Sequence, residues 1–239
     1  MRSIPTEESI TVEWFNACFA KAGLTGEVNG FDAARVGTGQ IGKCVRYTLR
    51  VADQGELPKS VIGKFPSDDE NSRKTGVVLL NFLKEVKFSQ ELQQRVAIKT
   101  PRCYFAEIID QGPEFFLLLQ DLAPAQQGDQ LAGCSPQVAK AALAELVGLQ
   151  APAWCDETLH ELRWLRDAET AALVNTMDLY RQTLPGFVER YGPHLAADEI
   201  AIIEQVGEAQ SSPLNADITE VFSFCLLYTS PSTRDVEES

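Results

Sequence analysis

Residues Gly37–Gly42 read G-T-G-Q-I-G and match the glycine pattern G-x-G-x-x-G. Glycines at this spacing let a backbone turn tightly and approach phosphate oxygens without a clashing Cβ atom. Alone, the pattern also fits an ordinary glycine-rich hairpin turn. Two kinds of nucleotide site can use it. A dinucleotide-binding turn opens a helix, whereas a kinase-type loop joins two strands and is followed by a lysine on the next strand.

The residues after the glycines favour the kinase-type arrangement. Residues 43–50 alternate with a period of two, as expected of a strand, and Lys64 lies late in a second strand expected over Ser60–Phe65. A helix expected from about Arg73 to Arg95 carries Glu85 on its apolar stripe. A carboxylate there is costly unless paired, so we expect Glu85 to pair with Lys64 and direct it onto nucleotide phosphates. The alternative is that Glu85 lies at the edge of the stripe and reaches water.

The elements that must position these residues are strands early in the chain and helices later. Besides the two strands above, the patterns indicate a first helix capped by Thr11 and strands around Cys103–Ile109 and Glu114–Leu119. A further helix is expected to be capped by Ser135, to have Pro136 at its first position and to run to about Gln150. Helices follow beyond Asp156, with breaks at Pro185-Gly186 and Gly192-Pro193. This segregation predicts an α+β protein with two lobes.

Composition excludes several classes of function. The formal net charge is −13 and the sequence pI is about 4.6, which argues against nucleic-acid binding. No apolar run approaches the roughly 18 residues of a membrane span, and the first residues lack the apolar core of a signal peptide. The six cysteines and two histidines, His160 and His194, show no metal-ligand or disulfide spacing. We therefore expect a cytoplasmic protein with no membrane partner and no metal site built from these residues.

Several motifs together resemble the aminoglycoside phosphotransferase superfamily, and within it the ecdysteroid-kinase-like and choline-kinase-like small-molecule kinases. The similarity covers roughly residues 10–210. The motifs are Gly37–Gly42, Lys64, Glu85-Val86-Lys87-Phe88, Thr100-Pro101-Arg102-Cys103-Tyr104, Leu117-Leu118-Leu119-Gln120-Asp121-Leu122-Ala123-Pro124 and Gly128-Asp129-Gln130. The resemblance implies a protein-kinase-like fold, with a β-rich nucleotide lobe over 1–119, a hinge over 120–130 and a partial helical lobe over 131–224. It also implies transfer of the ATP γ-phosphoryl group to a small-molecule hydroxyl with magnesium.

Carried over by position, the resemblance implies an ATP site. Val36 and Ile62 would pack on adenine, and the backbone of Gln120 and Leu122 would hydrogen-bond its edge. Lys64 would hold the α- and β-phosphates, oriented by Glu85. The loop residues that would cover the phosphates are Gly37, Thr38, Gly39, Gln40 and Gly42.

One departure from the family pattern concerns the chemistry itself. The family uses H-G-D-x-x-x-x-N, whose Asp accepts the hydroxyl proton and whose Asn binds metal. Neither His160 nor His194 is followed by Gly-Asp, and no Asp lies five positions before an Asn. We therefore assign no catalytic residue and no metal ligand, and expect the magnesium ligands outside this chain. A non-catalytic nucleotide-binding pseudokinase stays open as the alternative, and a dinucleotide-dependent oxidoreductase requires residues 43–50 to be helical.

The last residues have a different character. Residues 225–235 read C-L-L-Y-T-S-P-S-T-R-D and resemble the in-frame translation of a transposase-type sequencing adaptor. We expect residues 225–239 to be a non-native tail and exclude them from fold reasoning. Residues 215–224 match no family pattern. On this interpretation the chain is a kinase fragment that does not transfer phosphate.

Overall fold

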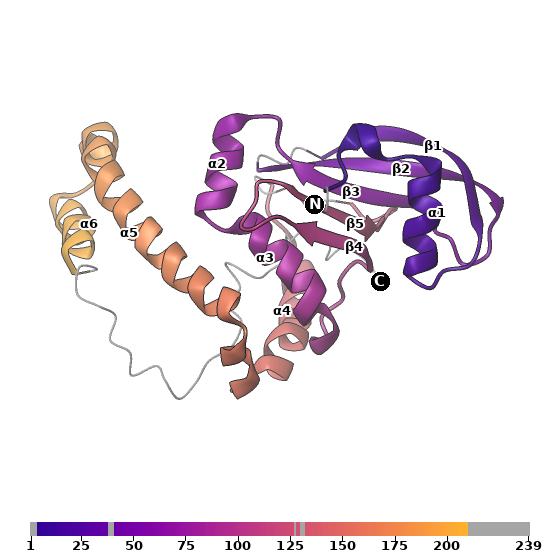
Figure 1. The fold of residues 1–239 in the computed structure, drawn as a ribbon. Coiled ribbons are helices and arrows are strands. Elements are labelled where there is room, and N and C mark those ends of the chain that lie inside the picture. The colour runs from indigo at the N-terminus through magenta and orange to yellow at the C-terminus, as the bar shows by residue number, and fades with distance from the viewer. Residues whose placement is uncertain (1–3, 38–40, 127, 130–131, 210–239) are drawn as a thin grey trace. The chain divides into compact units, whose positions relative to one another are not determined.

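A five-stranded antiparallel sheet organises the first part of the chain (Figure 1). The structure is a computed structural model that describes residues 4–37, 41–126, 128–129 and 132–209, without the side chains of 166–177 and 207–209. The strands are β1 (Glu27–Val36), β2 (Gly42–Asp53), β3 (Ser60–Pro66), β4 (Cys103–Ile108) and β5 (Phe115–Gln120). Their order in the sheet is β1-β2-β3-β5-β4, and every neighbouring pair is antiparallel. Strands gathered early and helices later make this an α+β fold, as expected, while β1 was not anticipated from the sequence.

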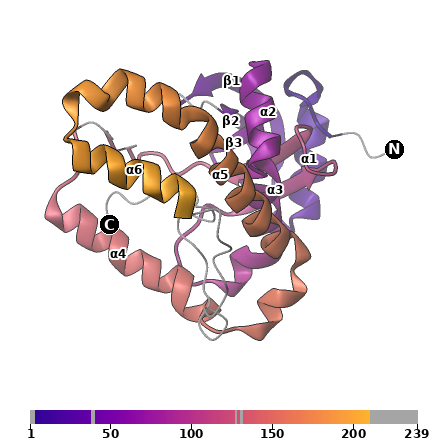
Figure 2. The ribbon, with the colours of Figure 1, turned by 90° about the vertical axis from the view of Figure 1, so that its left-hand side faces the viewer.

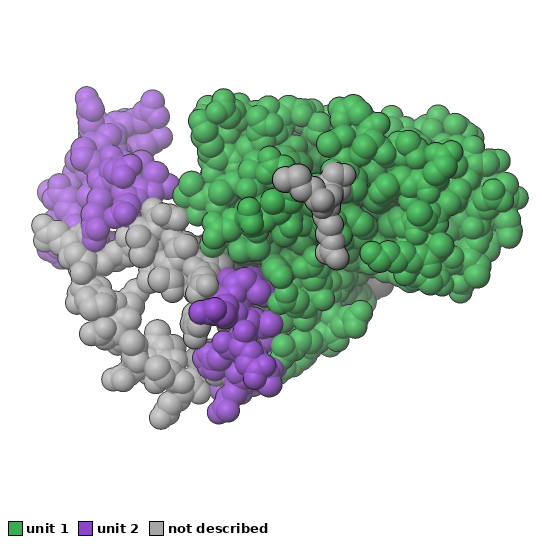
Figure 3. Space-filling view, viewed as in Figure 1, with its two compact units in different colours: residues 1–153, 224–239 green, residues 154–223 purple. Residues whose placement is uncertain are grey.

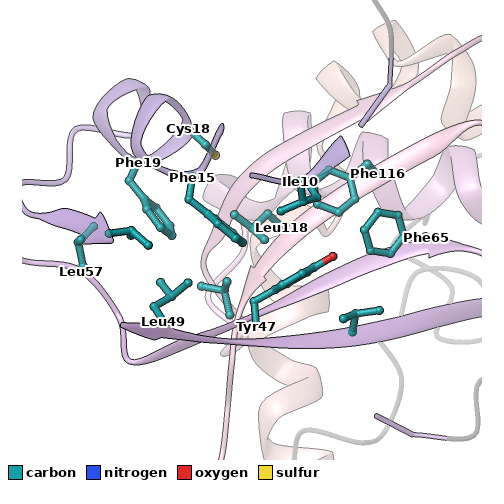
Figure 4. Close-up of a cluster of buried hydrophobic side chains, with 13 residues drawn as sticks. Ile10, Phe15, Cys18, Phe19, Tyr47, Leu49, Leu57, Phe65, Phe116 and Leu118 are labelled. Atoms are coloured by element: carbon teal, nitrogen blue, oxygen red, sulfur yellow. The ribbon is translucent and has the colours of Figure 1, made fainter. Parts of the chain in front are cut away.

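One face of the sheet is covered by helix α1 (Val12–Lys21). Thr11 caps the helix as predicted, with its hydroxyl accepting a hydrogen bond from the Trp14 N–H at 3.2 Å. Phe15 and Phe19 point from the helix into a cluster with the ring of Tyr47, and all three side chains are almost fully buried (Figure 4). Aromatic side chains bury large apolar areas, so this cluster forms the main core of the first unit.

Shorter helices cover the other face near β4 and β5. Helix α2 (Glu70–Val78) is followed by α3 (Asn81–Lys87), a π-type turn (Phe88–Leu92) and a 3-10 turn (Gln93–Arg95). Phe82 and Val86 of α3 pack against Phe115 and Leu117 of β5. Helices α1 and α3 lie apart in Figure 1, and in Figure 2 the fainter colour of α1 shows that it is farther from the viewer than α3.

The expectation of one continuous helix from Arg73 to Arg95 was wrong. Leu80 has a φ of 55°, in the left-handed region that a helix interior does not use, and its side chain is buried. The chain therefore changes direction between α2 and α3. This turn brings Gly76 of α2 against the Phe82 ring, in a space that a Cβ atom would fill.

The later helices are α4 (Pro136–Gln150), α5 (Arg163–Tyr191) and α6 (Ala197–Ala209), with 3-10 turns at Glu7–Ser9, Ala151–Ala153, Glu157–Glu161 and Gly192–His194. Ser135 caps α4 and Pro136 takes its first position, as predicted. The expected break at Pro185-Gly186 was wrong, because α5 continues through both residues. Proline removes one backbone hydrogen bond, a loss that a helix of 29 residues accommodates. The break at Gly192-Pro193 is confirmed, since α5 ends at Tyr191.

The described residues form two compact units (Figure 3). The first reaches Ala153 and the second begins at Trp154. Helix α4 thus belongs to the same unit as the sheet, whereas the resemblance implied a helical lobe over residues 131–224. The expected tail at 225–239 lies outside the described residues. Among the helices described, none combines the length and apolar character needed to cross a bilayer.

The hydroxyl of Tyr47 is an unusual polar atom in the core. Its ring is 1% exposed, burial raises the pKa of Tyr47, and the hydroxyl finds no hydrogen-bond partner among the described residues. Figure 4 shows the oxygen directed among apolar side chains. A buried hydroxyl without a partner costs free energy, because it loses its hydrogen bonds to water.

We expect Tyr47→Phe to leave the free energy of unfolding unchanged or to raise it by up to about 1 kcal/mol. Urea denaturation measures this change. Tyr180→Phe is the matched control, because the Tyr180 hydroxyl donates to the Ile203 carbonyl at 2.7 Å, and its loss should cost about 0.5–1.5 kcal/mol. A loss of more than about 1 kcal/mol in Tyr47→Phe would mean that the hydroxyl is hydrogen-bonded.

Candidate functional site

The site is built on the sheet face opposite α1. In antiparallel pairs, residues directly opposite each other point to the same face. The register aligns Val36 of β1 with Cys44 of β2, Cys44 with Lys64 of β3, and Lys64 with Leu117 of β5. A second row is formed in the same way by Ala34, Arg46, Ile62 and Leu119. The sheet therefore brings Val36, Ile62 and Lys64 onto one face, while the alternate residues of β2 and β3 enter the core under α1.

Lys64 and Glu85 form the expected ion pair. The Lys64 Nζ donates to Glu85 Oε1, and the two side chains are 25% and 37% exposed. Glu85 lies on α3 between Phe82 and Val86, whose packing on β5 holds the helix against the sheet. The pairing is thus confirmed, and the exposure of Glu85 shows that its carboxylate also reaches water, as the alternative of a position at the edge of the stripe expected. An ammonium fixed in this way on a strand is suited to bind an anionic group.

The glycine-rich segment joins β1 and β2, so it connects two strands rather than opening a helix. Gly37 has a φ of 72°, which favours glycine, and Gly42 begins β2. A Cβ atom on Gly42 would lie 3.1 Å from the Phe65 carbonyl oxygen and 3.4 Å from Lys64 Cε. The absence of a side chain at Gly42 therefore leaves room beside Lys64. Thr38, Gly39 and Gln40 lie outside the described residues.

Charged side chains tie the two strands together at the base of this segment. Asp68 accepts hydrogen bonds from Lys43 at 2.8 Å and from Arg35 at 3.2 Å, and Lys43 also pairs with Glu7 at 3.0 Å. The hydrogen bond from Lys43 lowers the pKa of Asp68, and the hydrogen bond to Asp68 raises the pKa of Lys43. Arg35 and Asp68 are largely exposed, so the main effect is to align the ends of β1 and β2 rather than to stabilise the fold.

The end of β5 contains the two expected hinge residues. The Gln120 N–H donates to the Arg102 carbonyl at 2.8 Å, so this N–H is not available to a ligand. Leu122 is half-buried, and its carbonyl accepts from the Ala125 N–H at 2.9 Å. Within the described ranges, the Leu122 N–H has no hydrogen-bond acceptor. The segment thus offers the Leu122 N–H as a backbone donor.

Asp121 lies between these residues; it belongs to the hinge motif of the sequence, but no role in the site was predicted for it. Its side chain is 4% exposed and accepts two hydrogen bonds from Arg46 of β2, at 2.6 and 3.1 Å. The Ser60 hydroxyl donates to it at 2.7 Å and the Ala123 N–H at 3.1 Å. Its signal in the sequence is weak. Asp121 stands two residues before Ala123, and from there its carboxylate can accept a hydrogen bond from the backbone of a turn.

Other residues of this face were also missed. Cys44, Leu117 and Leu119 share the two cross-strand rows with the expected residues. The period of two within β2 and β5 could have found them, because residues that are two apart on a strand point to the same face. Leu119 lies directly opposite Ile62 and extends the apolar face there, whereas Leu117 is buried against Phe82 and Val86 of α3.

A metal site is not formed by the described side chains. In the described ranges, no group of three or more His, Cys, Asp or Glu residues is arranged to hold a metal ion. The residues present therefore do not fit a magnesium site by themselves.

Comparison with known proteins finds no family model that matches the chain and no curated protein that matches it.

The Asp121 carboxylate gives the site a contribution to stability that depends on pH. Burial raises its pKa, but the hydrogen bonds from Arg46, Ser60 and the Ala123 N–H outweigh burial and hold the pKa of Asp121 below its ordinary value of 3.8. The unfolded chain then takes up the proton at a higher pH than the folded chain. The contribution is therefore complete above about pH 4 and is lost as the pH falls through the lower folded-state pKa.

We expect Asp121→Asn to lower the free energy of unfolding by about 2 kcal/mol at neutral pH, and this difference from the wild type to shrink below about pH 4. Urea denaturation across this pH range measures it. Asp32→Asn is the control, because Asp32 forms an exposed pair with Arg50 and should cost about 0.5 kcal/mol or less. A difference for Asp121→Asn that stays constant into strong acid would contradict the assignment.

Proposed function

We propose that the first unit binds ATP as the nucleotide-binding part of a small-molecule kinase of the aminoglycoside phosphotransferase-like class. The observation that carries the proposal is the ion pair between Lys64 on β3 and Glu85 on α3. In protein kinases a lysine on the third strand pairs with a glutamate on the following helix, and the lysine holds nucleotide phosphates.

The surroundings of the pair support the same interpretation. The glycine-rich segment joins β1 to β2, and β3 follows in the sheet with Lys64 near its end. Helix α3 comes between β3 and β4 in the chain and faces β5. This order agrees with the kinase-like nucleotide lobe that the sequence resemblance implies. An oxidoreductase of the dinucleotide type is disfavoured, because residues 43–50 form a strand.

The chemistry available to the site is recognition of a nucleotide. The apolar side chains of Val36 and Ile62 would contact the base, and Lys64 would offer its ammonium to phosphate oxygens. Glu85 restricts the lysine side chain, so less conformational entropy is lost when a phosphate binds. Glycines at this spacing would allow backbone N–H groups to approach the phosphates.

Phosphoryl transfer to a small-molecule hydroxyl is the activity that the resemblance implies. It needs a base and metal ligands, and the motif that supplies them is absent from the sequence. Magnesium would neutralise phosphate charge in such a reaction, but the described residues do not form a site for it. The second candidate is a nucleotide-binding module without transfer activity, and both candidates predict ATP binding.

We expect Lys64→Ala to weaken ATP binding by about tenfold or more, equivalent to about 1.4 kcal/mol. Glu85→Gln, which keeps the size of the side chain but removes its charge, should weaken ATP binding by a smaller factor because the lysine is no longer restrained. Isothermal titration calorimetry with ATP measures both.

Lys74→Ala is the matched control for these variants. Lys74 pairs with Glu70 within α2, and both side chains are exposed. Removing it changes the charge of the chain in the same way as Lys64→Ala without touching the site. Equal ATP affinity in Lys64→Ala and Lys74→Ala would overturn the proposed function.

A further inference from the structure

We propose that Asp121 is a positioning residue for the nucleobase, and that Arg46 and Ser60 hold it so that the Leu122 N–H has a fixed direction. The inference rests on the proposed function, and adds to it a residue that decides which base is bound. Asp121 would not touch the nucleotide. It would act through the backbone that follows it.

The carboxylate of Asp121 is saturated with donors. Oδ2 accepts from Arg46 Nε at 2.6 Å and from the Ser60 hydroxyl at 2.7 Å, while Oδ1 accepts from Arg46 Nη2 and the Ala123 N–H, both at 3.1 Å. Arginine matches a carboxylate with two parallel hydrogen bonds, and this adds geometric specificity. An amide in place of the carboxylate has one acceptor fewer, so asparagine cannot satisfy the four donors.

These bonds fix the segment that contains Leu122 at several points. Arg46 is in β2 and Ser60 is in β3, so the turn after β5 is attached to two other strands. On the far side of Leu122, the Ala123 N–H is bonded to Asp121, and the Leu122 carbonyl accepts from the Ala125 N–H at 2.9 Å. The backbone of Leu122 is therefore held on both sides, and its own N–H is left without an acceptor in the described part of the chain.

The same network borders the surface on which a base would pack. Arg46 is directly opposite Ile62 in the register of β2 and β3, and Ile62 is opposite Leu119 of β5. The apolar side chains of Ile62 and Leu119 and the N–H of Leu122 are thus attached to the same set of paired strands. An N–H donor that is fixed relative to these apolar side chains discriminates between nucleobases more strongly than a donor on a loose loop. The reason is that a small displacement is enough to lose the hydrogen bond.

A fixed N–H donor selects one purine over the other. On the edge that carries N1, adenine presents an acceptor nitrogen, whereas guanine presents an N–H group at the same position. The Leu122 N–H would donate a hydrogen bond to N1 of adenine. In a complex with guanine it would face another N–H group and remain unpaired, which weakens binding. The quantity that Asp121 controls is therefore the ratio of the dissociation constants for GTP and ATP.

The experiment measures binding of ATP and GTP to the full chain by titration calorimetry. We expect the wild type to prefer ATP by about tenfold or more, the factor that one well-placed hydrogen bond gives. Asp121→Asn and Arg46→Lys should reduce that preference severalfold, and Ser60→Ala, which removes one donor, should reduce it less. Lys64→Ala should weaken both nucleotides by the same factor, because phosphates are common to them.

Asp32→Asn is the matched control. Asp32 pairs with Arg50 between β1 and β2, and both side chains are exposed. The substitution is the same as at Asp121 and also removes an arginine–carboxylate pair, yet it should leave the ratio unchanged. Circular dichroism and urea denaturation establish which variants fold. If Asp121→Asn does not fold, Arg46→Lys and Ser60→Ala decide the question.

The outcomes separate the two proposals. A wild type that binds neither nucleotide overturns the proposed function and this inference with it. A wild type that binds ATP and GTP equally well, or folded variants that lose affinity for both nucleotides by one factor, overturns this inference alone. A loss of preference for ATP confined to the variants of Asp121, Arg46 and Ser60 supports it.

Discussion

A lysine ammonium held against the face of a β-sheet is the constraint on which the first unit depends. Lys64 has Cys44 and Leu117 as its cross-strand neighbours, and neither can balance its charge. A half-buried charge needs an opposite charge nearby, and a helix outside the sheet supplies it as Glu85. The carboxylate is in the right place because Phe82 and Val86 pack on β5. Apolar packing thus determines the electrostatics of the site.

Features that depend on short stretches of sequence could be predicted. The caps Thr11 and Ser135 were recognised because their side chains bond to backbone groups three residues later. Strands β2 to β5 follow from alternation or apolar runs. The pairing of Lys64 with Glu85 was also predicted from the sequence, although the residues are 21 positions apart. A carboxylate on the apolar stripe of a helix is costly unless it has a partner of opposite charge.

Features set by distant contacts or by partial exposure could not be predicted. In β1, most residues after Gly30 are exposed, so the strand lacks the alternation that marks its neighbours. The turn at Leu80 uses a backbone conformation that leucine rarely adopts, and nothing in its composition signals it. Arg46 and Asp121 are 75 residues apart, and each resembles an ordinary surface charge until the sheet brings them together.

The two faces of strand β3 have different roles, one in the core and one in the candidate site. Val61 and Phe65 enter the core under α1, whereas Ile62 and Lys64, one position away, face the candidate site. The positions that determine whether the unit folds are therefore interleaved with those that determine what it binds, but they contact different neighbours. Substitutions on the site face can therefore change the ligand during evolution while the aromatic core on the other face stays intact. One fold can then acquire new ligands without first becoming more stable.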